Sequence, residues 1–125
     1  MDAPHLSDLE RLAMERVWAL GDATVRAVLE GLNEDRSRRP RAYTTVLTIM
    51  QRLEAKGMLE RLEGDGAGVY RATIAREDYL GARVDEEVSR LVEDFGELAL
   101  VQFARQVDAL DPARREALRR LGEAD

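Results

Sequence analysis

Hydrophobic side chains recur at helical spacing in two stretches near the N-terminus. In the first, residues 7–10 (SDLE) match a capping box, and apolar residues follow every three or four positions until Gly21. In the second, the same spacing begins after Thr24 and ends near Asn33. The polar and basic residues 34–40 that follow end in a proline, so we expect a loop there. The pattern predicts two helices followed by a loop.

The next stretch, residues 41–53 (RAYTTVLTIMQRL), is rich in residue types that favour strands, yet its apolar positions predict a third helix. Val46, Ile49, Met50 and Leu53 fall at i, i+3, i+4 and i+7, which is one face of a helix. Gly57 stands where a left-handed C-terminal cap belongs. Opposite the apolar face or on its flank lie three threonines and an arginine: Thr44, Thr45, Thr48 and Arg52.

Threonine is a poorer helix former than the charged residues that usually cover an exposed helix face. Its hydroxyl, however, can form hydrogen bonds with phosphates and base edges, and its methyl group can contact a thymine methyl. The face that carries Thr44, Thr45 and Thr48 is therefore a candidate DNA-reading surface, with threonines placed there by chance as the alternative.

Two short strand-like segments follow, residues 58–63 and 69–72, with the glycine-rich residues 64–68 between them. This order is typical of a β-hairpin. Because both flanks of the glycine-rich loop are strands, a nucleotide-binding loop, which leads into a helix, is not expected. Three helices followed by a hairpin indicate a winged helix, a helix-turn-helix variant whose third helix enters the major groove.

From Glu77 the pattern changes to long amphipathic helices. One apolar stripe begins at Leu80 and ends before Gly96, a second segment follows, and Asp111-Pro112 is typical of the start of a last helix. About fifty residues cannot bury such stripes alone, so we expect self-association, with packing inside one chain as the alternative. The prediction is a mainly α fold with a small β-hairpin: a winged-helix DNA-binding domain in residues 1–74 and a helical dimerisation domain in residues 75–125.

The charge distribution adds to this picture. The 125-residue chain has a net charge of −6, but residues 74–125 hold 8 basic and 13 acidic side chains, whereas residues 1–73 hold 11 and 12. Between Arg36 and Arg61 seven basic residues stand against two acidic ones. A local basic patch is what phosphate binding requires, because counterion release depends on the charges at the contact. The basic residues of this patch are Arg36, Arg38, Arg39, Arg41, Arg52, Lys56 and Arg61.

Composition excludes several other classes of protein. The chain has no cysteine and a single histidine, His5, so thiolate metal sites, disulfides and cysteine nucleophiles are excluded, and we expect no metal or cofactor. No carboxylate cluster or serine–histidine pair suggests catalysis, so an enzyme is not expected. No apolar run approaches the roughly 20 residues of a membrane span, and a signal peptide is lacking, so a cytoplasmic location without membrane insertion is predicted.

Four stretches carry a resemblance to a known family: LSDLERLAMERVWAL (residues 6–20), TTVLTIMQRLEAKGML (44–59), VYRATIAREDYL (69–80) and LVQFARQVDAL (100–110). Through them the chain resembles the penicillinase repressors of the BlaI/MecI type, which include the CopY-type copper repressors. The resemblance covers almost the whole chain, and the Thr-Val-x-Thr-x-x-x-Arg-Leu core is more specific than a generic winged helix.

The resemblance implies a homodimeric repressor of β-lactam resistance or cell-envelope stress genes that reads a palindromic operator. It also implies release through a membrane sensor-protease, and the bond cut in staphylococcal relatives, Asn-Phe, aligns with Gln102-Phe103. Release driven by a ligand or by mass action alone is the alternative to cleavage. The family's DNA-contacting positions fall on Thr44, Thr45, Leu47, Thr48 and Arg52. Several relatives have lysine in place of Thr44 and glutamine in place of Leu47, so the base preference of this chain is an open question.

Two other functions stay open at this stage. A metal-responsive CopY-like repressor would need the cysteine-rich C-terminal hook of that group, which this sequence lacks. A helical adaptor that binds another protein and no DNA would suit the acidic C-terminal half. The salt dependence of binding to a palindromic duplex distinguishes the adaptor from the repressor.

Overall fold

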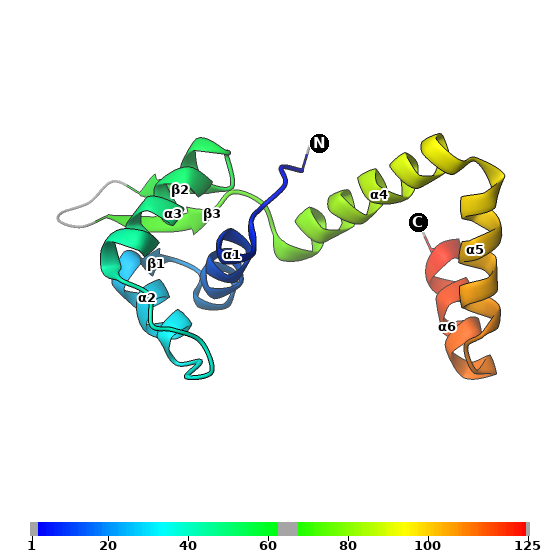
Figure 1. The fold of residues 1–125 in the computed structure, drawn as a ribbon, viewed down its shortest axis with the longest axis horizontal. Helices are drawn as coiled ribbons and strands as arrows, with labels where there is room; N and C mark the ends of the chain where they lie inside the picture. The colour runs from blue at the N-terminus through cyan, green and yellow to red at the C-terminus, as the bar shows by residue number, and fades with distance from the viewer. Residues whose placement is uncertain (1–2, 63–67, 125) are drawn as a thin grey trace. The chain divides into compact units, whose positions relative to one another are not determined.

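The computed structural model describes residues 3–62 and 68–124, which form two compact units, residues 1–83 and 84–125. The first unit, the head, contains three helices, three strands and the beginning of a fourth helix (Figure 1). Its elements are α1 (Asp8–Leu20), β1 (Ala23–Thr24), α2 (Val25–Asn33), α3 (Tyr43–Ala55), β2 (Leu59–Leu62), β3 (Val69–Ala72) and the start of α4 (Arg76–Phe95). The second unit holds the rest of α4 with α5 (Glu97–Asp108) and α6 (Pro112–Glu123).

The helix boundaries follow the capping signals in the sequence. At the start of α1 the backbone N–H of Glu10 donates to Ser7 Oγ at 3.2 Å, and the N–H of Ser7 donates to Glu10 Oε1 at 2.8 Å. This reciprocal pair is the predicted capping box. Thr24 caps α2 by accepting from the N–H of Ala27 at 3.1 Å, and Gly57, with φ of 81°, follows α3 as predicted. The three expected helices are confirmed.

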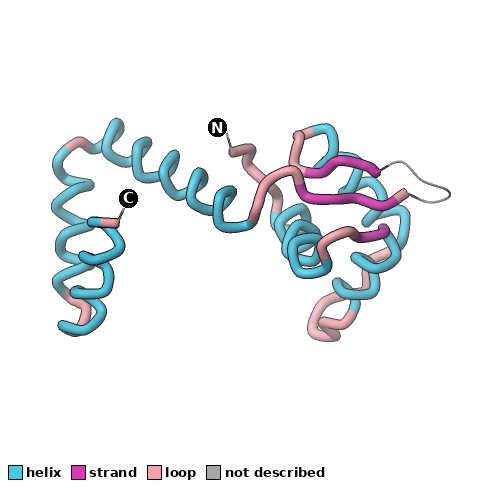
Figure 2. Tube along the Cα trace, turned by 180° about the vertical axis from the view of Figure 1, so that it is seen from behind, coloured by secondary structure: helices cyan, strands magenta, loops and turns pink. Residues whose placement is uncertain are grey.

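The sheet is antiparallel, and its strand order is β1-β3-β2 (Figure 2). Leu59 pairs with Ala72 and Leu62 with Val69, which confirms the two predicted strands of the hairpin. Residues 63–67, which include most of the predicted glycine-rich tip (residues 64–68), lie outside the described residues. β1 adds a third strand in which Ala23 pairs with Tyr70. The sequence did not predict β1, because two residues are too few to display an alternating pattern.

The core of the head lies where α1, α2 and α3 meet the sheet. The apolar stripe predicted for α3 is buried, with Val46, Met50 and Leu53 fully inaccessible and Ile49 6% exposed. From the other elements the buried side chains are Ala13, Met14, Val17, Ala23, Val25, Val28, Met58, Leu59 and Tyr70. α3 therefore keeps its helical form through packing, which overrides the strand preference of its β-branched residues.

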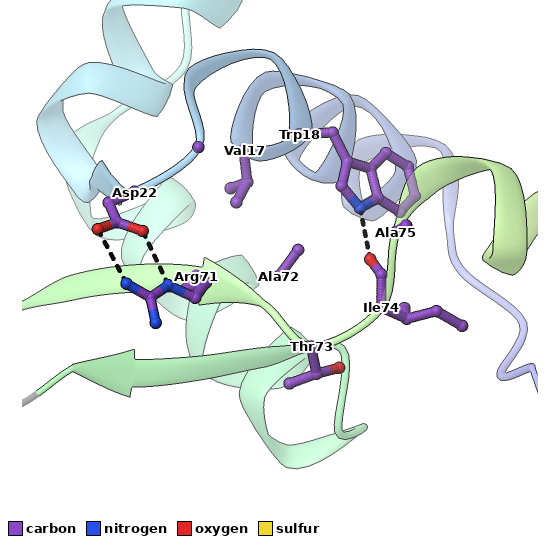
Figure 3. A pocket seen from close by; sticks show the side chains of 9 residues that line it. Val17, Trp18, Asp22, Arg71, Ala72, Thr73, Ile74 and Ala75 are labelled. Atoms are coloured by element: carbon purple, nitrogen blue, oxygen red, sulfur yellow. Dashed lines mark hydrogen bonds and ion pairs between the residues drawn. The ribbon is translucent and has the colours of Figure 1, made fainter.

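The first turns of α4 also belong to the head. Tyr79 is 3% exposed, and its ring lies 5.8 Å from that of Trp18, centroid to centroid. The indole N–H of Trp18 donates to the carbonyl of Ile74 at 2.9 Å, just before α4 begins (Figure 3). The division between the two compact units lies inside α4, after Arg83. The functional boundary that the sequence analysis placed after residue 74 stays a prediction. The dimerisation role of the C-terminal helices stays a prediction.

The second unit is amphipathic, and much of its apolar surface is uncovered. Gly96, with φ of 61°, separates α4 from α5, and Asp111 caps α6 by accepting from the N–H of Arg114 at 3.0 Å, both at the predicted positions. The exposed large apolar side chains of α4, α5 and α6, here called the apolar face, are Val84, Val88, Leu91, Phe95, Leu98, Leu100, Val101, Val107, Leu118 and Leu121.

Candidate nucleic-acid interface

Most of the predicted DNA-reading residues lie on one exposed side of α3. Thr44, Thr45, Thr48 and Arg52 are exposed, while the opposite side of the helix is buried in the core. Leu47 differs from them, because its side chain is partly buried and packs against the core cluster. The exposed side of α3 thus offers hydroxyls, methyl groups and one guanidinium, and Leu47 contributes only the accessible part of its side chain.

The hydroxyl of Thr48 already has a hydrogen-bond partner within the helix. It donates to the carbonyl of Thr44, one turn earlier, at 2.9 Å. Such bonds are common for threonine in helices, and they leave the lone pairs of the oxygen free to accept. Thr48 can therefore accept a hydrogen bond from an exocyclic amino group of adenine or cytosine, or place its methyl group against thymine.

The entry to α3 is held by a side chain that the sequence analysis did not single out. Asn33, the last residue of α2, accepts from the N–H of Arg41 at 2.8 Å and donates to the carbonyl of Arg41 at 3.1 Å. The side-chain amide of Asn33 thus pairs with both the N–H and the C=O of Arg41, as a residue of a neighbouring strand would, and so positions the loop that leads into α3. No sequence signal revealed it, because the contact joins residues on opposite sides of the loop.

Arginines gather near the start of α3. The guanidinium of Arg26, on α2, lies over the ring of Tyr43 with its Cζ 5.4 Å from the ring centroid, a cation–π contact. In the loop Arg38 pairs with Asp35 at 3.4 Å, whereas Arg36 and Arg39 donate no side-chain hydrogen bond and form no ion pair within residues 3–62 and 68–124. Arg26 lay outside the predicted basic patch, and its place beside Tyr43 makes it a further candidate phosphate contact.

Lys56 has a different role from the one that the charge count suggested. Its ammonium Nζ lies 2.8 Å from Oε1 of Glu10, a carboxylate that is 4% exposed. Burial alone raises the pKa of Glu10, but the hydrogen bonds from Lys56 and Ser7 outweigh it and bring the pKa below its ordinary value. Lys56, at the end of α3, therefore neutralises the buried carboxylate of Glu10. Its positive charge is largely compensated within the head and contributes little to the basic patch.

The hollow in Figure 3 lies beside the sheet and the start of α4, and its volume is about 300 Å³. The charged side chains that line it are Asp22 and Arg71, which face each other in a double contact at 3.0 and 3.2 Å. The Arg71 guanidinium lowers the pKa of Asp22. Because these two charges satisfy each other, the hollow offers no unpaired charge to a ligand.

The predicted cleavage pair lies in the middle of α5. Gln102 is exposed and Phe103 is half-buried, and both line an apolar hollow of about 220 Å³ together with Leu91, Phe95 and Leu98. A protease needs an extended substrate, so this part of α5 must unwind before the bond can be cut.

Two further expectations concern metals and membranes. Among the described residues, no group of three or more His, Asp or Glu side chains is arranged to hold a metal ion. Within the same residues, none of the helices combines the length and apolar character that a membrane crossing requires.

Comparisons with known proteins agree with this geometry. Residues 6–124 match the model of a family described as penicillinase repressor. The chain is 37% identical over 119 residues to the transcriptional regulator BlaI of Mycobacterium tuberculosis, in strains CDC 1551 and H37Rv, covering 93% of this chain and 81% of the relative. Among solved structures it is similar to a MarR family protein from Bacillus stearothermophilus, with a TM-score of 0.50, 16% identity, and 96% and 75% of the two chains covered.

Proposed function

Because the chain belongs to the penicillinase repressor family, a family of transcriptional regulators and not of enzymes, we propose that it is a homodimeric repressor that binds palindromic operator DNA. The observation that carries the proposal is the exposed side of α3. Thr44, Thr45, Thr48 and Arg52 lie there together, although helix propensity disfavours the threonines. α3 is the helix that a winged-helix protein places in the major groove.

The arginines around α3 supply the phosphate contacts. Arg26, Arg36, Arg39 and Arg41 lie on α2 or on the loop that enters α3, and Arg61 lies on β2. Phosphate contacts fix the register of a protein on DNA, and base contacts provide the sequence preference. In this arrangement the arginines hold the head on the backbone while the α3 threonines meet the base edges.

The apolar face of the second unit supports the homodimer. Phe95, Leu98 and Leu121 are 60%, 60% and 71% exposed in the single chain. Exposed apolar surface of this extent marks an interaction site in a soluble regulator. A second copy of the chain is the partner that suits the apolar face best. Once one head of such a dimer has bound a half-site, the other head is held at a high effective concentration near the second half-site, which a single head lacks.

The proposal extends to the genes that the chain regulates and to the signal that releases it from the operator. The relative's name and the family description favour genes of β-lactam resistance or cell-envelope stress, controlled in the cytoplasm. We propose that a membrane sensor-protease releases the operator by cutting Gln102-Phe103. The cut would remove the second half of α5 and all of α6 from the apolar face. The dimer would then be weakened, and the higher operator affinity that comes from two linked heads would be lost.

The DNA-binding proposal is tested by titrating the full chain against the duplex upstream of its own gene at increasing salt. Affinity should fall steeply with salt, because released counterions drive phosphate binding. Absence of binding even at low salt would leave the helical adaptor as the better function. The cleavage proposal is tested by intact-mass spectrometry of the chain from cells under β-lactam stress, where derepression with an uncut chain would exclude it.

A further inference from the structure

The start of α3 differs from the starts of α1 and α2. The side chains of Ser7 and Thr24 cap α1 and α2, whereas the residue before α3 is Ala42, whose side chain can accept no hydrogen bond. The first backbone bond of α3, from the N–H of Val46 to the carbonyl of Ala42, is 3.2 Å long. The residues next to α3 therefore do not supply the side-chain cap that would fix where this helix begins.

A contact from α2 takes the place of this cap. Asn33 pairs with both the N–H and the C=O of Arg41, the residue just before Ala42, at 2.8 and 3.1 Å. Tyr43 and Val46 also hold α3, because their side chains pack in or against the core cluster. Apolar packing has no preferred direction, however, whereas two hydrogen bonds to one residue fix both its position and its orientation. The direction in which the chain enters α3 thus depends on Asn33.

We propose that Asn33 is a specificity-determining positioning residue, which holds the first turn of α3 so that Thr44 and Thr45 meet the base edges. Both threonines are exposed and follow Arg41 by three and four residues. A hydrogen bond to a base needs a donor–acceptor distance of about 2.7–3.2 Å, so a displacement of about 1 Å in this turn is enough to lose it. Thr48 lies one turn further on and is held by the backbone bonds of the helix. This inference rests on the proposed function, in which α3 reads operator DNA.

The tip of the same loop is held by a separate set of contacts. Oδ1 of Asp35 accepts from the N–H and the hydroxyl of Ser37 at 3.1 and 2.5 Å, and Oδ2 pairs with Arg38. These contacts join residues of the loop to one another. Ser37→Ala is therefore a matched control, because it removes a hydrogen bond from the loop and leaves the pair of Asn33 with Arg41 in place.

The test uses the full chain with two substitutions, alone and combined. Asn33→Ala removes the amide, and alanine is a better helix former than asparagine, so α2 itself is not weakened. Ala42→Ser supplies a local cap in its place. Ala42 is exposed and has the extended backbone of an N-cap residue, with φ of −84° and ψ of 153°, so a serine there can accept from the N–H of Thr45. The double variant Asn33→Ala/Ala42→Ser should therefore recover what Asn33→Ala loses.

The first measurement is amide hydrogen exchange, which needs no DNA. In Asn33→Ala the exchange should become faster at Val46 and Leu47, whose N–H groups close the first turn of α3. Met50 and Leu53, further along the same helix, should keep wild-type protection. In the double variant the protection at Val46 and Leu47 should return.

The second measurement is binding to the operator duplex upstream of the chain's own gene, to random DNA and to operators with single base-pair changes. Discrimination between operator and random DNA should fall about tenfold in Asn33→Ala, near the low end of what one good base contact contributes. Affinity for random DNA and its salt dependence should stay at wild-type values, because the arginines remain. The loss should be confined to base pairs whose preference Thr44→Ala or Thr45→Ala also lowers, and Ser37→Ala should discriminate like the wild-type chain.

Wild-type discrimination in Asn33→Ala, or no recovery in the double variant relative to Ala42→Ser alone, would overturn the inference. A loss spread evenly over all base pairs, or equal on operator and random DNA, would also overturn it, because Asn33 would then support only the fold of the head. If the wild-type chain does not discriminate between duplexes, the proposed function fails. Exchange at Val46 and Leu47 then still decides whether Asn33 fixes the start of α3, and unchanged exchange there would show that it does not.

Discussion

Replacing Lys56 with methionine should destabilise the head, because it leaves the carboxylate of Glu10 buried without its cation. Oε1 of Glu10 would keep the hydrogen bond from the N–H of Ser7 but lose the ammonium at 2.8 Å. Its other oxygen, Oε2, is buried and accepts no hydrogen bond in the described part of the chain. Methionine preserves the length of the side chain, so the change concerns charge more than packing.

The size of the effect follows from the burial of the two partners. Removing one partner of a fully buried ion pair costs about 3–5 kcal/mol, whereas an exposed pair contributes about 0–1 kcal/mol. The Glu10 side chain is 5% exposed but that of Lys56 is 37% exposed, so solvent screens part of the interaction. We expect a loss of about 2 kcal/mol in the free energy of unfolding, and recovery of about half of it when Glu10→Gln is added.

The assay is urea unfolding followed by circular dichroism at one fixed protein concentration, since the proposed dimerisation would make stability depend on concentration. Arg71→Met is the matched control: it breaks the exposed pair with Asp22 and should have a smaller effect. A Lys56→Met variant no less stable than Arg71→Met, or a double variant no better than Lys56→Met, would refute the reasoning.

The same pair predicts a pH dependence. The pKa of Glu10 is lowered in the folded chain, so its contribution to stability is present above the ordinary value of 4.5 and is lost as the pH falls through the folded value. In Lys56→Met burial remains and the main lowering interaction is gone, so the pKa rises. The stability difference between the two proteins should therefore be full at neutral pH and shrink as the pH falls from the raised pKa of Glu10 in the variant towards its lowered pKa in the wild-type chain.

Three further predictions concern DNA binding, the extent of the head and the dimer. Thr48→Ala should weaken operator binding by about 1–3 kcal/mol and leave binding to random DNA unaffected, whereas Arg52→Ala should weaken binding to both duplexes and lower the slope of log affinity against log salt by about one. Fluorescence anisotropy on both duplexes measures these effects, and equal losses on operator and random DNA for both variants would exclude Thr48 as a base contact and Arg52 as a phosphate contact. A head ending at Ala75 should be about 3–5 kcal/mol less stable to urea than one ending at Arg83, because it lacks the buried Tyr79, and equal stabilities would return the boundary to residue 74. Leu98→Ser should shift the full chain toward monomer in sedimentation equilibrium, and an unchanged dimer would place the interface elsewhere.

Elements with a strong local signal could be predicted from the sequence. The capping box at Ser7, the glycine after α3 and the Asp111-Pro112 start of α6 all depend on residues within a few positions of one another. The exposed side of α3 was predictable for the same reason, because helical periodicity alone separates Thr48 from Val46.

Contacts between distant segments could not be predicted in this way. Lys56 was assigned to the basic patch because its partner Glu10 lies 46 residues away in the chain. The boundary at residue 74 followed the change in hydrophobic pattern, which carries no information about where Tyr79 packs. Leu47 was placed among the DNA-reading residues by family resemblance, and the packing of α3 covers part of its side chain.

The central claim, that this chain is a dimeric reader of operator DNA, is tested most directly by selecting binding sites for the full chain from a pool of random duplexes and sequencing those retained. The account predicts an inverted repeat whose half-sites are about one helical turn, or a multiple of it, apart. A retained pool with no common sequence, or no retention even at low salt, would contradict it.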